Sequence, residues 1–185
     1  MNEKLGVDDR MVASAVMGEG MVEEVSAPVI TYDMECFDKD GNLKWVERVR
    51  NTVMTGGKND LLDKYFAGSS YTATWYVGLI DNASYSAIAA ADVMNSHAGW
   101  IEGVPYSNAN RLAPTWSSAS AGSKAASTYV EFTINATLTV KGAFLTSNST
   151  KSGTTGILYS ASAFGANRSV VSGDFLRVTP TMAVA

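Results

Sequence analysis

The sequence predicts a mainly β protein: an antiparallel β-sandwich, jelly-roll or immunoglobulin-like, with one short helix and an extended N-terminal arm. The first observation is that seven or eight segments after residue 28 alternate apolar and polar residues, as half-buried strands do. The second is that turns rich in Gly, Asn and Ser separate them. Residues 1–27 lack this alternation. We therefore expect an N-terminal arm, 1–27, followed by one sandwich domain, 28–185.

The first predicted strand follows Pro28, and the second returns from a hairpin turn at residues 38–41. Gly41 occupies the turn position that requires a positive φ. The alternation predicts inward side chains on both strands: Ile30, Tyr32, Met34 and Cys36 on the first, and Leu43 and Trp45 on the second. Asp38, Asp40, Gly41 and Glu47 also match part of a calcium-binding loop, but Cys36 stands at its first ligand position and the flanks are strand-like. A plain hairpin is therefore expected.

The stretch 51–81 combines a predicted helix with a predicted central strand. Asn59 is a plausible N-cap and Gly68 a plausible stop. Apolar residues fall at helical spacing on one face, and we expect this face to plug one end of the sandwich: Leu61, Leu62, Tyr65 and Phe66. Residues 75–80 are apolar in both alternating sets, which predicts a strand buried on both faces.

A long excursion, residues 83–107, follows that strand and is unusually apolar for a loop. Long irregular loops are uncommon unless they bind something. Two interpretations stay open for Trp100 and Tyr106. Their side chains either pack into the protein's own core or, together with Ile101, contact a partner, where Trp and Tyr commonly anchor interfaces.

Further strands are expected in the second half of the chain, at 112–116, 128–134, 138–144, 157–164 and 175–184. A polar turn is expected at 147–155 and a tight connection at 166–168. Pro180 cannot donate a hydrogen bond to a neighbouring strand, so we expect the last strand to lie at a sheet edge there.

Composition excludes several classes of protein. The net charge of -4 and the pI near 4.9 argue against non-specific nucleic-acid binding. No apolar run is long enough for a membrane helix, and the charged N-terminus lacks the apolar core of a signal peptide. Cys36 is the single cysteine, which rules out an intrachain disulfide and fits a reducing cytosol. We expect neither a nucleic-acid nor a membrane partner.

No catalytic arrangement stands out in the sequence, so we expect neither an enzyme nor a bound cofactor. His97 is the single histidine, no serine stands in a Gly-x-Ser-x-Gly motif, and residues 55–58 are not a phosphate-binding loop. A Cys36–His97 dyad is conceivable, but Cys36 alternates with core residues of its strand. One His and one Cys cannot build a zinc site. The remaining acids are too scattered for a glycosidase pair: Glu102, Glu131 and Asp174.

The arm carries apolar residues that a solvated tail would leave exposed. It is either a flexible leader or an arm that orders on a neighbouring subunit. Met adapts well to irregular surfaces. The predicted partner contacts are Met11, Val12, Val16 and Met21 in the arm and Trp100, Ile101 and Tyr106 in the long loop.

Four stretches carry a resemblance to a known family: NTVMTGGKNDLLDKYFAGSSYTATWYVGLID (51–81), SHAGW (96–100), TWSSASAGSKA (115–125) and VKGAFLTSNSTKSGTTGILYSASAF (140–164). As a set they resemble a family of tailed-bacteriophage virion structural proteins, whose members are described as head, tail-fibre or hypothetical proteins. The resemblance spans about residues 28–184 and supplies no catalytic residues.

The resemblance implies a virion component on the capsid exterior, made in the host bacterial cytoplasm. The expected function is that of a decoration or cement protein that binds the major capsid protein and self-associates as a dimer or trimer. A tail-fibre or receptor-binding component that contacts host glycans through residues 147–155 is the alternative. A secreted carbohydrate-processing enzyme is disfavoured by the missing signal peptide and acid pair.

Overall fold

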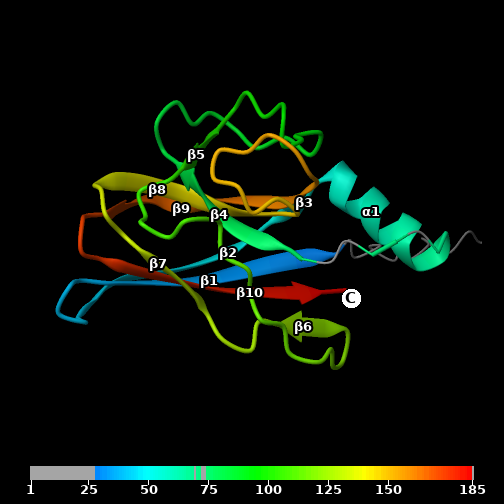
Figure 1. Cartoon of the computed structure of the whole chain (residues 1–185), viewed down its shortest axis with the longest axis horizontal. Helices are drawn as coiled ribbons and strands as arrows, with labels where there is room; N and C mark the ends of the chain where they lie inside the picture. The colour runs from blue at the N-terminus through cyan, green and yellow to red at the C-terminus, as the bar shows by residue number, and fades with distance from the viewer. Residues whose placement is uncertain (1–27, 69, 72–73, 185) are drawn as a thin grey trace, which may run out of the picture.

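A computed structural model describes residues 28–68, 70–71 and 74–184, so the arm predicted at 1–27 lies outside the described residues. It confirms the antiparallel β-sandwich, with one helix among the residues it describes. Two sheets of five strands face each other, and the helix α1 (Thr55–Phe66) projects beyond one end of them (Figure 1).

The first sheet has the order β2-β1-β10-β6, with β7 also paired to β10. Its strands are β1 (Val29–Phe37), β2 (Leu43–Arg50), β6 (Ser123–Ala125), β7 (Val130–Thr133) and β10 (Phe175–Ala183). The second sheet has the order β3-β9-β8-β4-β5. It consists of β3 (Thr52–Val53), β4 (Tyr76–Asp81), β5 (Ile101–Gly103), β8 (Leu138–Thr146) and β9 (Leu158–Val170).

The main core lies between the two sheets, where their alternating inward side chains meet. The four residues predicted to point inward from β1 are all buried there: Ile30, Tyr32, Met34 and Cys36. The turn after β1 also forms as expected, with Gly41 at φ 83°. The hairpin prediction is thereby confirmed.

A second core covers the outer face of the second sheet. Ile80 of β4 and Phe144 of β8 point away from the main core and pack against Trp100 and Met94 from the long loop. The loop passes over this sheet in the upper part of Figure 1. The prediction that β4 is buried on both faces is confirmed, and the loop is what buries its second face.

The helix differs from the prediction in position and in surroundings. It begins at Thr55 rather than after Asn59, with Met54 as its extended N-cap residue. Gly68, at φ 67°, stands just beyond its end as expected. The apolar face does not plug the sandwich, because the only buried residue of the helix is Gly57. That part of the prediction is wrong.

Pro180 does not mark an edge, because β10 lies between β1 on one side and β6 and β7 on the other. The Pro180 carbonyl accepts a hydrogen bond from Ala126 N at 2.9 Å. The nitrogen of a strand residue points to the same side as its carbonyl. On that side β7 pairs with β10 only as far as Val178, and β6 pairs with β10 only from Thr181 onward. The missing N–H therefore falls in the gap between two short strands.

Three local predictions are also corrected by strand register. Leu43 is exposed, because a register shift pairs it with Phe37 on the outer face. Residues 166–168 do not end a strand: β9 continues, and a bulge lies opposite Lys141, where Val140 pairs with Arg168 and Gly142 with Ala163. Residues 112–116 form only isolated bridges, at Leu112 and Trp116.

Candidate interaction surface

The largest apolar side chains left in solvent gather on α1 and the segment after it. Leu62 is 53% exposed, Tyr65 74%, Phe66 77% and Tyr71 81%. The rings of Tyr65 and Phe66 pack edge-to-face at 4.9 Å but have little else around them. Scattered exposed apolar residues are ordinary, whereas a contiguous group marks an interaction site more often. We name these four residues, with Leu61, the α1 surface.

The first turn of α1 is held firmly against the second sheet, which fixes the direction in which the helix projects. Met54 N donates to Tyr159 O of β9 at 2.9 Å, and Thr55 N donates to Ala90 O at 2.9 Å. A Cβ at Gly57 would lie 2.6 Å from Tyr159 O, so only glycine allows this approach. The anchored glycine turn presents the rest of the helix, and with it the α1 surface, to solvent.

Two apolar hollows continue the α1 surface toward the ends of β1 and β10. One, of about 240 Å³, lies between Pro28 and the start of β1, the end of β10 and residues 119–124. The other, of about 190 Å³, lies beneath α1 and contains Trp75 and Tyr71. The two share Leu61, Tyr159 and Met182. We call the larger hollow the β1–β10 groove.

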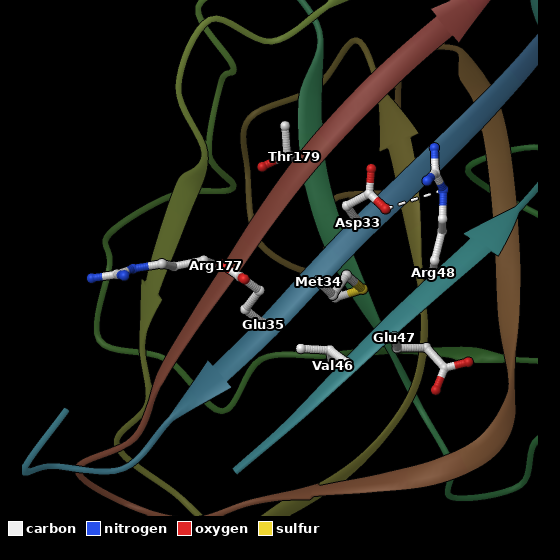
Figure 2. A pocket seen from close by; sticks show the side chains of 8 residues that line it. All are labelled: Asp33, Met34, Glu35, Val46, Glu47, Arg48, Arg177 and Thr179. Atoms are coloured by element: carbon white, nitrogen blue, oxygen red, sulfur yellow. Dashed lines mark ion pairs between the residues drawn. The ribbon is translucent and has the colours of Figure 1, made fainter. Parts of the chain in front are cut away.

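A wider and more polar hollow, of about 620 Å³, lies on the outer face of the first sheet, across β1, β2 and β10 (Figure 2). In Figure 2 Arg48 reaches Asp33, with 3.2 Å between Nε and Oδ1, whereas Arg177 points to the opposite side. Arg177 Nε donates to Glu131 at 2.8 Å, and this hydrogen bond raises the pKa of the guanidinium. Charges of both signs thus pair within the sheet face, which makes it a solvated polar surface.

The structure corrects two of the partner contacts predicted from sequence. Trp100 and Tyr106 are each 1% exposed, so the alternative in which they pack into the protein's own cores is what the structure shows. Trp100 Nε1 donates to Asp92 at 2.9 Å. Ile101 of the edge strand β5 is 46% exposed and stays a candidate. The predicted contacts in the arm lie outside the described residues: Met11, Val12, Val16 and Met21.

Cys36 and His97 do not form a dyad. Cys36 lies in the main core, 3.8 Å from Asp174, and burial raises the pKa of its thiol from 9.0 to about 12. His97 stacks on Trp100 at 3.9 Å, beyond the second sheet. The described residues contain no group of His, Cys, Asp and Glu arranged to hold a metal ion.

The carboxylate of Asp38, which matched a calcium-loop position, accepts hydrogen bonds from Asn42 Nδ2, Asn42 N and Asp40 N. These bonds, led by the one from the Asn42 side chain, lower the pKa of the Asp38 carboxyl. The oxygens of Asp38 therefore close the hairpin turn, as the sequence predicted.

The sequence identified four residues of the α1 surface as one face of a helix but assigned that face to the end of the sandwich; Tyr71, which follows the helix, was not among them. Periodicity reports which residues share a face and not what that face meets.

Comparison with protein-family models and with curated proteins finds no match for this chain. No helix within the described ranges is long and apolar enough to cross a bilayer.

Proposed function

We propose that this protein is a virion structural protein of a tailed phage, a decoration or cement protein that binds the outside of the head. Its contacts would be with the major capsid protein and with further copies of itself, as a dimer or trimer. The observation that carries the proposal is the α1 surface, an apolar group held in solvent by a helix whose first turn is anchored. Apolar and aromatic side chains of this kind anchor protein–protein contacts.

The composition of the chain after residue 66 supports an assembly role. After residue 66 the chain holds only 6 of its 14 Lys and Arg and 5 of its 18 Asp and Glu. A neutral, hydroxyl-rich surface packs beside other subunits with little charge repulsion. Weak contacts suffice in such an assembly, because many copies act together on one shell.

The alternative is a tail-fibre or receptor-binding component that contacts glycans through residues 147–155. The contacts of this loop support that alternative less well. Polar groups of residues 147–155 bond within the protein: Asn148 Nδ2 to Thr155 Oγ1 at 2.6 Å, and Gly153 O to Arg111 at 3.0 Å. A loop whose polar groups are used internally offers fewer of them to a sugar. Adsorption of the purified protein to host cells would favour this alternative over head binding.

The test is co-sedimentation with phage heads that lack the protein. Leu62→Gln with Phe66→Gln should weaken binding by roughly a hundredfold or more, because each removes an apolar contact of about 1.5–3 kcal/mol and every 1.4 kcal/mol is about a tenfold change in affinity. The matched control is Leu43→Gln with Val46→Gln, which alters two exposed apolar residues of β2, each 55% exposed, away from α1.

Deletion of residues 1–26 tests the arm in the same assay, and we expect binding to be lost while the sandwich stays folded. Immunogold labelling of intact particles supplies the location. Particles that do not contain the protein would refute the proposed function, and equal losses from both double variants would refute the α1 surface as its site.

A further inference from the structure

We propose that the β1–β10 groove is the docking site for the chain's own segment 21–27, which seats Met21, Val22 and Val25 in it. The segment belongs to the part of the chain that the structure does not describe. This inference concerns the chain alone and does not depend on the proposed function.

Continuity of the chain carries the first step of the argument. The described chain begins at Pro28, and Pro28 and Val29 themselves line the groove. Val25 lies three residues before Pro28, and Met21 lies seven residues before it. An extended chain spans at most about 3.6 Å per residue, so these side chains lie within roughly 11–25 Å of the groove. So short a tether gives the segment an effective concentration in the millimolar range.

The size and lining of the groove carry the second step. Its volume of about 240 Å³ is below the roughly 300–1,000 Å³ of small-molecule sites. Its walls are mainly apolar and include Leu61 of α1, Met182 of β10 and Val184. A hollow of this kind accepts a few aliphatic side chains from a peptide, and Met suits irregular apolar sites.

Charge carries the third step. Residues 1–27 contain two basic and six acidic residues, so the net charge of -4 of the whole chain is also that of this segment. Glu23 and Glu24 stand between the apolar residues proposed to dock. The lining of the groove includes Lys124 and no acidic residue. An acidic segment with interspersed apolar side chains therefore meets no like charge in the groove.

Docking of residues 21–27 has a consequence for the rest of the arm. It would fix where residues 1–20 leave the sandwich, beside the α1 surface. Met11, Val12 and Val16 would then remain free to contact another molecule, whereas Met21 would face its own chain instead of a partner.

Cysteine cross-linking in the full chain tests this inference. The native Cys36 is fully buried and should not react with the cross-linker, so only the introduced thiols are cross-linked. Val22→Cys is combined with Leu61→Cys, at the groove, and the rate of cross-linking by a short bis-maleimide is measured. The matched control combines Val22→Cys with Leu43→Cys, another exposed leucine, which pairs with Phe37 at the opposite end of β1.

We expect the 22–61 pair to cross-link within the monomer several-fold faster than the 22–43 pair. Adding Met21→Ser and Val25→Ser should slow the 22–61 reaction, whereas Met11→Ser and Val12→Ser should not. This second comparison separates docking from mere proximity of a tethered chain. Equal rates for the two pairs, insensitivity to the serine substitutions at 21 and 25, or cross-links that join only different chains would each overturn the inference.

Discussion

Arg111 holds Glu102 in a two-bond ion pair inside the protein, with Nε–Oε1 at 2.9 Å and Nη2–Oε2 at 2.7 Å. The side chains are 1% and 7% exposed. The same guanidinium donates to Asn148 O and Gly153 O, and Ser152 N donates to Glu102 Oε2. One buried pair therefore joins β5, the segment before Leu112 and the loop between β8 and β9.

The first prediction concerns this pair. Arg111→Met should lower the free energy of unfolding by about 3–5 kcal/mol, because it leaves the Glu102 carboxylate buried without a counter-charge. Urea denaturation measures the loss. The control is Arg48→Met, since Arg48 and Asp33 form an exposed pair, and it should cost no more than about 1 kcal/mol. Similar losses in the two variants would contradict the structural role given to Arg111.

The second prediction concerns the two adjacent glycines of α1. Gly57→Ala should destabilise the protein by about 1–3 kcal/mol, because the new Cβ would meet the backbone of Tyr159 at 2.6 Å. Gly56→Ala is the control: its nearest neighbour is Leu158 O at 3.9 Å. Gly56 lies in the first turn of α1, where alanine should be neutral or stabilise the protein by up to about 1 kcal/mol, because it reduces the conformational entropy of the unfolded chain. Thermal melting of both variants checks this, and equal melting temperatures would show that α1 is not anchored at Gly57.

The third prediction concerns alkaline pH. Burial raises the pKa of the Cys36 thiol, so below pH about 9 the thiol is protonated in both states and its contribution to stability is complete. Between pH about 9 and about 12 the unfolded chain loses this proton while the folded chain keeps it. Stability should then fall by about 1.4 kcal/mol per pH unit through this group.

The measurement is the free energy of unfolding at several pH values for the wild type and for Cys36→Ala. The slopes should differ by about 1.4 kcal/mol per pH unit near pH 10, with the wild type steeper. Comparing slopes removes the constant cost of the smaller side chain. It also removes the titration of buried tyrosines such as Tyr106, whose pKa is raised by burial in both proteins. Parallel slopes would mean that Cys36 titrates normally in the folded state.

Local pattern predicted much of this fold. The alternation in β1 identified its four buried residues, and the two apolar sets of residues 75–80 identified a strand covered on both faces. Gly41 and Gly68 were predicted from the backbone conformations that turns and helix ends demand, and both have positive φ. These features depend on neighbours within a few residues, which is why the sequence by itself determined them.

Only the tertiary structure decided what each apolar face meets. The apolar face of α1 lies in solvent because the anchored glycine turn directs the helix away from the sandwich. Trp100 lies in a core because its loop folds back over the second sheet. Pro180 is tolerated inside a sheet because two short strands leave a gap beside it. Each outcome rests on contacts between residues far apart in the chain, and periodicity within one segment carries no information about them.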